Sequence, residues 1–461
     1  MKVIRILFDD IIDDIIIPNT IPISIRESYI TARLSNTLDD FKNAYLEKYN
    51  KHFPHDSYLR FFHLNNCDTI SDANDSHDLP YFGSPDVEYM YFIGTGGNIS
   101  HGLNVDEIPN YQSYFDSLSA DVLHYLKTKS NFYIMIRQNQ EGIFFKDFEK
   151  IYKDCVKYNI PLDKIIISSD IFNFNDIVNE IENKYNCNFN IKYFTFPWAL
   201  YQAAHLIEDL QENNNIINDI SNNKEFKLLC LNRKLKENRV FLLSYLLSKN
   251  YEKSSLISFD SKFIENMDNM MDVMKSYNNP DIVSGYLKLI DINRTILDVD
   301  DLNDNVSLIT DDKSLYEHSF ISVVTETETH SDKVRFTEKL LKPILNYHPF
   351  IVYGPSHILE ILKYYGFKTF NNYLDESYDL IHDTNDRAIS IFNVIDNIMM
   401  WDNDTMNKFT ENVKDILIHN RLILEKFTYN NLVDEYHTNL LLLIDGKLDT
   451  KYNSIISTKF I

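Results

Sequence analysis

Short apolar segments alternate with longer segments of helical character over most of the chain, and this alternation limits the fold more than any other feature. Strands are expected at residues 87–93, 132–136, 165–168, 191–196, 227–230, 255–259, 320–324, 350–353 and 368–370. Helices are expected at residues 111–127, 145–157, 171–185, 198–211, 239–249, 263–277, 338–346 and 358–365. Strands that alternate with helices predict βαβ units and an α/β fold with mainly parallel sheets.

An Asn-rich stretch interrupts the alternation and predicts a division into two domains. A chain of 461 residues is also too long for one ordinary hydrophobic core. The predicted parts are an appended region (1–75), a first Rossmann-like domain (76–212), a linker (213–225), a second Rossmann-like domain (226–400) and C-terminal helices (401–461). We expect the two Rossmann-like domains to face each other across a cleft. Residues 260–318 are less regular and are expected to contain loops besides one helix.

The charge of the chain argues against nucleic acid as a general partner. Acidic side chains number 68 and basic ones 45, which gives a net charge of -23. Such a charge repels polyanions unless basic groups gather in one place. A local basic groove therefore remains an open alternative.

The cysteines and the apolar segments point to a reducing cytoplasm. The chain has four cysteines, far apart and without Cys-x-x-Cys spacing, so no zinc site or disulfide framework is expected: Cys67, Cys155, Cys187 and Cys230. His, Asp and Glu spacings do not indicate any other metal site. No segment reaches the length of about 18 apolar residues that spans a bilayer.

The segment Phe336-Thr337-Glu338-Lys339 lies between two apolar strand-like runs and is the most informative local motif. It is expected to form the turn that opens a helix at the carboxyl end of a strand, where ligands bind in open α/β sheets. There a Glu can hold a sugar hydroxyl, and a Lys beside helix-start amides can hold a phosphate. Lys342-Pro343 follows, and the proline should bend or shorten the helix.

The same motif also has a purely structural explanation. Thr337 can cap the helix and Glu338 can favour its dipole while Lys339 is solvated. A similar pattern occurs at Thr325-Glu326-Thr327, where the Glu326 carboxylate is a candidate general base.

Basic residues follow the strand expected at 227–230. Arg233, Lys234, Lys236 and Arg239 gather there in an otherwise acidic chain, and such cations suit a diphosphate. A solvated basic turn is the alternative.

Two loops of the first half are further candidates. Gly94, Thr95, Gly96 and Gly97 follow a strand, in a chain with only 10 glycines, and are expected to approach an acceptor or a phosphate. A mobile connection explains them almost as well. Glu141 follows the next strand and is a candidate base for activating an acceptor, although a surface role is the alternative.

The ordered motifs of the second half resemble a family of glycosyltransferases with the GT-B arrangement, found in phages, giant viruses and bacteria. The motifs are Leu231-Asn232-Arg233, Asn238-Arg239, Ile257-Ser258-Phe259, Val324-Thr325-Glu326-Thr327, Phe336-Thr337-Glu338-Lys339, Lys342-Pro343, Pro349-Phe350-Ile351, Gly366-Phe367 and Asp375-Glu376-Ser377-Tyr378-Asp379. The Thr-Glu-Lys element is similar to the donor-binding signature of fucosyltransferase-like enzymes. Where those enzymes continue with a small-residue turn, this chain has Asn346-Tyr347-His348.

The resemblance implies a metal-independent glycosyltransferase that needs no cofactor besides a nucleotide-sugar co-substrate. It implies Glu338 at the donor ribose and Lys339 at the diphosphate, with Arg233 as a second phosphate ligand by position. The expected acceptor is a hydroxyl of unspecified origin, on a glycan, a protein or a small molecule. The expected location is the cytoplasm, or the host cytoplasm if the protein is viral. Two alternatives stay open: a non-catalytic binding or virion-associated protein, and a DNA-modifying glycosyltransferase of a phage.

Overall fold

The computed structural model describes residues 3–8, 59–63, 87–94, 115, 118, 120–138, 145–201, 203, 204, 207, 224–232, 235–265, 267–297, 313–330, 333–444 and 446–448. The chain forms two compact units. Unit 1 comprises Met1–Pro197 and Val433–Ile455, and unit 2 comprises Trp198–Leu432 and Ile456–Ile461. The division at Pro197 therefore precedes the linker predicted at residues 213–225.

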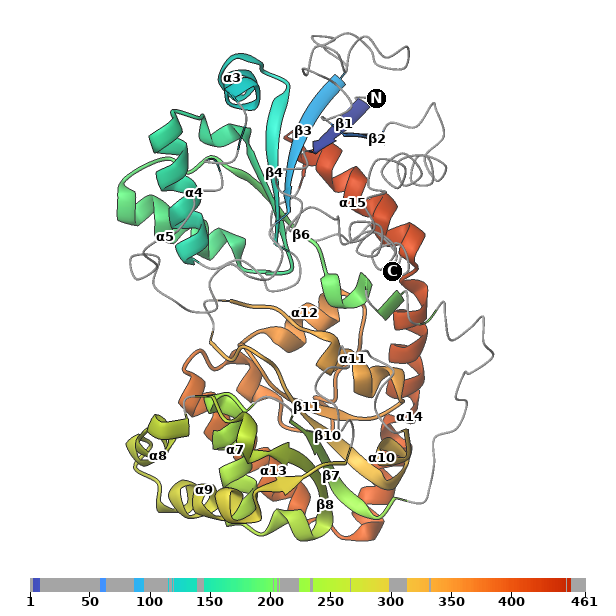
Figure 1. The fold of residues 1–461 in the computed structure, drawn as a ribbon. Helices are drawn as coiled ribbons and strands as arrows, with labels where there is room; N and C mark the ends of the chain where they lie inside the picture. The colour runs from blue at the N-terminus through green and yellow to red at the C-terminus, as the bar shows by residue number, and fades with distance from the viewer. Residues whose placement is uncertain are drawn as a thin grey trace, which may run out of the picture. The chain divides into compact units, whose positions relative to one another are not determined.

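Unit 1 is built on a parallel sheet of six strands (Figure 1). In spatial order the strands are β2 (Leu59–His63), β1 (Val3–Phe8), β3 (Val87–Gly94), β4 (Phe132–Gln138), β5 (Ile165–Ser169) and β6 (Lys192–Thr195). Its helices include α3 (Ala120–Thr128), α4 (Phe145–Tyr158) and α5 (Phe174–Tyr185).

The first strands of unit 1 differ from the prediction that residues 1–75 are an appended region. β1 pairs with β3 on one side and with β2 on the other, so both early strands belong to the sheet. Their partners lie far along the chain, and a local sequence pattern does not reveal such pairing. The strand order changes direction between β1 and β3, and Gly94 ends β3 at this point.

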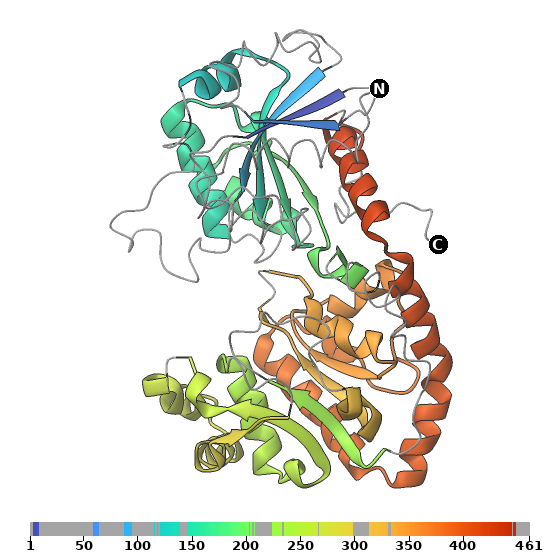
Figure 2. The same cartoon turned by 45° about the vertical axis from the view of Figure 1, so that its right-hand side comes forward.

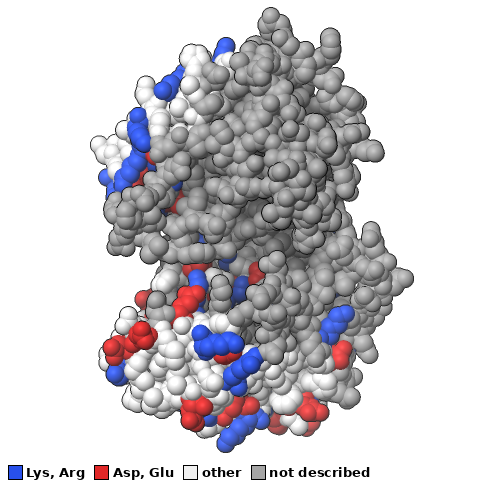
Figure 3. Space-filling model, in the orientation of Figure 1, with Lys and Arg blue, Asp and Glu red and all other residues white. Residues whose placement is uncertain are grey.

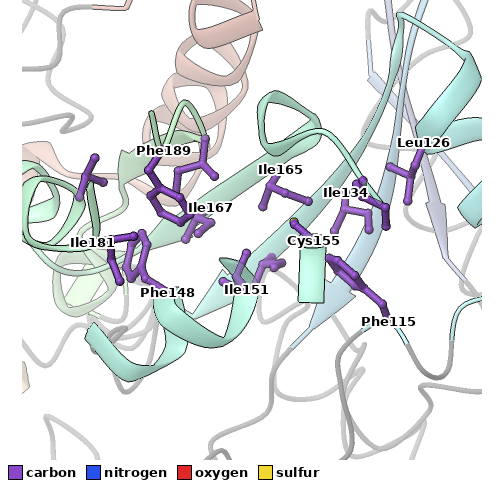
Figure 4. Packing of buried hydrophobic residues seen from close by; sticks show 14 of the residues in the cluster. Phe115, Leu126, Ile134, Phe148, Ile151, Cys155, Ile165, Ile167, Ile181 and Phe189 are labelled. Carbon is purple, nitrogen blue, oxygen red and sulfur yellow. The ribbon is translucent and has the colours of Figure 1, made fainter. Parts of the chain in front are cut away.

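The core of unit 1 lies between its helices and one face of the sheet. Ile165 and Ile167 are two residues apart on β5, so their side chains share a face, and both are fully buried. Phe148 of α4 and Ile181 of α5 belong to the same buried cluster (Figure 4). The Phe148 ring also makes an edge contact with the ring of Phe189. This apolar packing fixes α4 and α5 on the sheet.

Unit 2 is built on a second sheet. Its spatial order is β11 (Phe350–Tyr353), β10 (Ser319–Thr325), β7 (Phe226–Leu231), β8 (Ser255–Asp260) and β9 (Arg294–Thr295). All neighbours are parallel except β8 and β9, which are antiparallel. Every residue of β10 is buried, as expected for a strand covered on both faces of a parallel sheet.

Helices cover the sheet of unit 2. They are α7 (Glu237–Ser248), α8 (Met267–Ser276), α9 (Pro280–Ile292), α10 (Lys313–His318), α11 (Glu338–Leu345), α12 (Ile358–Tyr364), α13 (Thr384–Met400) and α14 (Asn403–Lys426). The helices α7 to α9 lie on one side of the sheet and α14 on the other (Figure 2). A further helix, α15 (Tyr429–Ile444), begins in unit 2 and continues into unit 1.

The predicted α/β fold with parallel sheets is confirmed for the described residues, with local differences. Part of the region 260–318, where loops were expected, forms α9, β9 and α10. The strand predicted at residues 368–370 is absent from the structure, which describes these residues as irregular. The Asn420 side chain explains this, because it accepts from the Lys368 N–H at 2.7 Å and donates to its carbonyl at 2.8 Å. These are the backbone groups that a neighbouring strand would use.

Candidate functional site

The strand order of unit 2 changes direction between β7 and β10. From β7 the chain continues to β8 and β9 on one side of the sheet, and then to β10 and β11 on the other. In open α/β sheets ligands bind outside the carboxyl ends of the strands at such a point. The residues that follow β7 and β10 are therefore the first place to look for a site.

Side chains from three elements meet at this point. The Thr325 hydroxyl, at the end of β10, donates to the Asn232 side chain after β7 at 2.5 Å. From the first turn of α7, Asn238 donates to the Glu326 carbonyl at 3.2 Å and Arg239 to the Thr325 carbonyl at 3.4 Å. The motifs that the sequence analysis singled out after β7, at the start of α7 and at the end of β10 therefore contact one another, although they are far apart in the chain.

The start of α11 follows from its sequence. Thr337 has extended backbone angles, and its hydroxyl oxygen accepts from the Lys339 N–H at 3.4 Å, which caps the helix. Glu338 lies in the first turn, where a negative charge favours the helix dipole. Pro343 lies inside the helix, which ends two residues later, as predicted for a shortened helix.

The Glu326 side chain contacts the residue that caps this helix. Its carboxylate accepts from the Thr337 N–H at 2.9 Å and from the Thr337 hydroxyl at 2.6 Å. Only 1% of Glu326 is exposed. Burial raises the pKa of Glu326, while the Lys339 charge and the two Thr337 hydrogen bonds oppose the rise.

Glu338 and Lys339 form an ion pair at the helix start. The Lys339 Nζ lies 2.7 Å from the Glu338 Oε1, and the two side chains are 29% and 20% exposed respectively. The same ammonium also donates to the Thr337 hydroxyl oxygen at 3.3 Å. Burial alone would raise the pKa of Glu338, but the charge and hydrogen bond of Lys339 outweigh it and the pKa is lowered. Glu338 is therefore an ionised acceptor beside a cation that solvent can reach.

Arg239, which the sequence analysis grouped with the cations that suit a diphosphate, is buried. It is 5% exposed, and burial lowers its pKa while the charges of Glu326 and Glu338 oppose this. A guanidinium remains charged in proteins even so. Its position behind Thr325 favours support of the site over direct contact with a ligand.

Two further candidate residues, Lys342 and Gly94, lie within the described part of the chain. Lys342 lies on α11 and its charge also lowers the pKa of Glu338. Glu141, Arg233, Thr95, Gly96 and Gly97 lie outside the described residues, and Gly94 is the last residue of β3.

Two residues of the site were missed by the sequence analysis. A Cβ on Gly354, after β11, would lie 3.2 Å from the Glu326 Cγ, so glycine leaves room for the buried carboxylate. Arg387 of α13 donates to the carbonyls of Gly354 at 3.0 Å and of His382 at 3.1 Å, and also to those of Ile381 and Thr329. The position of Gly354 directly after a strand could have predicted that it lies near the site, whereas no local sequence pattern predicts this for Arg387.

Acidic and basic side chains are interspersed over the described residues of the face in Figure 3. Within the described part of the chain, His, Cys, Asp and Glu do not form a group of three or more that could hold a metal ion. None of the helices described combines the length and apolar character needed to span a bilayer.

Comparisons with known proteins give no family assignment. No protein-family model matches the chain, and no curated protein matches it either.

Solved structures are distantly similar. A UDP-forming α,α-trehalose-phosphate synthase from Burkholderia xenovorans is 9% identical, with a TM-score of 0.38 over 78% of this chain and 74% of that one. A glycosyltransferase from Rickettsia africae is 12% identical, with a TM-score of 0.34 over 97% and 100%. The N-terminal domain of a trehalose-6-phosphate phosphatase from Candida albicans is 12% identical, with a TM-score of 0.36 over 86% and 75%. The identities of 9% to 12% and the TM-scores of 0.34 to 0.38 mark all three similarities as distant.

Proposed function

We propose that the chain is a glycosyltransferase that moves a sugar from a nucleotide diphosphate sugar to a hydroxyl acceptor, without a catalytic metal. The observation that carries the proposal is the gathering of Glu326, Thr337, Glu338 and Lys339 with Arg239 where the strand order of unit 2 changes direction. This is the position at which open α/β sheets bind nucleotides.

Glu338 and Lys339, both half-buried, are proposed to bind the donor together with Arg233. The Lys339 ammonium binds the diphosphate by exchanging part of its contact with Glu338 for a phosphate oxygen. The ionised Glu338 carboxylate accepts hydrogen bonds from ribose hydroxyls. Arg233 follows Asn232 in the chain and is proposed as a second phosphate ligand.

The transfer itself requires a base and a stabilised leaving group. The acceptor oxygen forms a bond to the anomeric carbon, and the bond from that carbon to the phosphate oxygen breaks. The nucleoside diphosphate leaves with the electron pair, and cations at its oxygens stabilise the developing charge. A carboxylate takes the acceptor proton, and Glu141 of unit 1 is proposed for this step. Gly94, which ends β3 beside the change of strand order in unit 1, is proposed with Thr95, Gly96 and Gly97, which follow it in the sequence, to contact the acceptor or a phosphate.

A nucleotide panel tests the proposal directly. UDP, GDP, ADP and CMP are added to the protein in EDTA-containing buffer, and the melting temperature is recorded, because a ligand that binds only the native state stabilises it by RT ln(1 + [L]/Kd). We expect at least one nucleotide to raise the melting temperature. Failure of the whole panel would instead favour a non-catalytic protein.

The variant Lys339→Met assigns the binding to this site. Loss of a charge-assisted hydrogen bond is expected to weaken nucleotide binding about tenfold to hundredfold. The matched control is Lys414→Met, which removes an exposed lysine of α14. Equal affinity in the two variants would contradict the assignment of the site.

A further inference from the structure

The end of β10 is tied to the start of α11 by one pair of side chains. Glu326 and Thr337 are eleven residues apart, and both carboxylate oxygens accept hydrogen bonds from Thr337. Since Glu326 is 1% exposed, water does not compete for these bonds. The pair therefore fixes Thr337 both through its main chain and through its hydroxyl.

The hydroxyl of Thr337 also orients Lys339. A hydroxyl has one hydrogen, and Thr337 donates it to Glu326 at 2.6 Å. The lone pairs of the same oxygen then face Lys339, whose N–H and Nζ lie 3.4 Å and 3.3 Å away. Glu326 thus sets the orientation of the hydroxyl that holds both the backbone and the ammonium of Lys339.

Glu326 is itself held in place by its main chain and its neighbours. Its N–H donates to the Tyr353 carbonyl at 2.9 Å, and its carbonyl accepts from Asn238 at 3.2 Å. Gly354 leaves just enough room for its side chain. The charge of Lys339 opposes the rise in the pKa of Glu326 that burial causes, and the charge of Glu326 in turn opposes the fall in the pKa of the buried Arg239.

We infer that Glu326 is a positioning residue for donor binding: through Thr337 it fixes the first turn of α11, and so the direction of Glu338 and Lys339. This inference rests on the proposed function. The same geometry disfavours Glu326 as the general base, because a base must reach the proton of the acceptor. The burial of Glu326 and its two bonds to Thr337 keep its carboxylate behind the helix start.

Matched variants of the two partners provide the test. Thr337→Ser keeps both hydrogen bonds, whereas Thr337→Val keeps the shape and removes the hydroxyl. Glu326→Asp shortens the side chain and draws the carboxylate away from Thr337. The double variant Glu326→Asp/Thr337→Val shows whether the two residues act through one contact. Each protein is assayed for the dissociation constant of UDP and GDP, for its melting temperature and for sugar release from UDP-glucose and GDP-fucose.

A positioning role predicts a specific pattern. Thr337→Val and Glu326→Asp each weaken binding of the nucleoside diphosphate about tenfold. The double variant has the same affinity as whichever single variant binds less tightly, because both changes break one contact. Thr337→Ser binds within about twofold of the wild type, since its hydrogen bonds remain. Thr337→Val also removes the cap of α11 and the hydroxyl donor of the buried Glu326 carboxylate, so its melting temperature is expected to fall by a few degrees. The affinities are therefore compared at a temperature at which every variant is folded.

Three outcomes would overturn the inference. Unchanged nucleotide affinity with a slower turnover in Glu326→Asp would make Glu326 a base. Losses that add in the double variant would mean that the residues act independently. A wild-type affinity in Thr337→Val, measured at a temperature at which the variant is fully folded, would mean a purely structural role.

Hydrogen exchange separates a failure of the inference from a failure of the proposed function. The amides of residues 337–341 are expected to exchange faster in Glu326→Asp than in the wild type, with or without a ligand. If the wild type binds neither UDP nor GDP, the proposed function fails and the role in donor binding fails with it. Unchanged exchange in a protein that binds nucleotide would overturn the inference alone.

Discussion

Gly285 of α9 packs directly against the backbone of Ser244 of α7. A Cβ on Gly285 would lie 1.7 Å from the Ser244 carbonyl oxygen, closer than any real contact allows. The two helices can approach this closely only because residue 285 has no side chain. Together with α8, they form the layer on one side of the sheet of unit 2 (Figure 2).

The variant Gly285→Ala should therefore be strongly destabilising. We expect a loss of about 3 kcal/mol in the free energy of unfolding, because α9 must move away from α7. Urea unfolding measures this. Ser284→Ala on the exposed face of α9 is the control and should change stability by less than about 0.5 kcal/mol. Equal stability of the two variants would contradict the close helix contact.

Gly354→Ala should affect the site more than the fold. The added Cβ would lie 3.2 Å from both the Glu326 Cγ and the Ile358 Cδ1, so the Glu326 side chain has to shift. We expect a stability loss of about 1 kcal/mol and a weaker affinity for the nucleoside diphosphate. The control is Gly366→Ala, at a positive φ of 82°, where a Cβ would make only an ordinary contact with Ile423 at 3.6 Å; it should lose similar stability but keep its affinity. Unchanged affinity in Gly354→Ala would count against the role of Glu326.

The buried His348 makes the stability of unit 2 sensitive to acid. Burial and the nearby charge of Lys224 hold the pKa of His348 well below its ordinary value of 6.5. Its ring nitrogens lie 2.7 Å from the Ser322 hydroxyl and 2.8 Å from the Ser319 carbonyl. In the unfolded chain His348 gains a proton near its ordinary pKa, whereas in the folded chain it stays neutral. The free energy of unfolding should therefore fall as the pH drops below about 6.5 and level off above it.

Urea midpoints between about pH 5 and about pH 7.5 measure this dependence. His348→Gln removes the group that titrates and should flatten this part of the profile. Lys224, whose pKa burial lowers to about 8, adds its own dependence only near the top of this range. An identical slope in the variant would show that other groups cause the pH dependence.

Arg387 should be essential to the loops around the site. It is 1% exposed, and its guanidinium donates to four carbonyls, two of which, on Gly354 and Thr329, follow β11 and β10. Arg387→Lys should cost about 3 kcal/mol, since an ammonium cannot reproduce the planar set of donors. Ile389→Ala, at a half-exposed position of the same helix, is the control for helix α13. A loss below about 1 kcal/mol in Arg387→Lys would contradict this role.

Lys342 should contribute less to nucleotide binding than Lys339. It lies one turn further along α11, and its charge lowers the pKa of Glu338 less than the charge of Lys339 does. We expect Lys342→Met to weaken binding of the nucleoside diphosphate only about threefold at low salt, with the effect fading at high salt. Titrations of Lys342→Met and Lys339→Met at two salt concentrations check this order. A larger effect of Lys342→Met would move the phosphate site along the helix.

Local sequence signals predicted much of the secondary structure. The start of α11 was predicted at Glu338 because a capping Thr and a first-turn Glu act within one helical turn. The helix α9 was missed, although Asn279 caps it and Pro280 opens it, both of which are visible in the sequence. The alternation of strands and helices predicted the parallel sheets, because the spacing of apolar residues within each segment indicates whether it is a strand or a helix and which of its faces is buried.

The tertiary structure alone decided which of these elements meet. Pairing of β1 with β3 and the bond between Thr325 and Asn232 join residues that are distant in the chain, and no local pattern encodes such partners. The burial of Glu326 and Arg239 likewise depends on the helices and strands packed around them. The sequence by itself determined that Thr337, Glu338 and Lys339 open a helix with a charged first turn. Only the packing of β10, β11 and α7 shows that Glu326, a candidate general base in the sequence, is a buried support for that turn, because burial and hydrogen-bond geometry arise from contacts between elements.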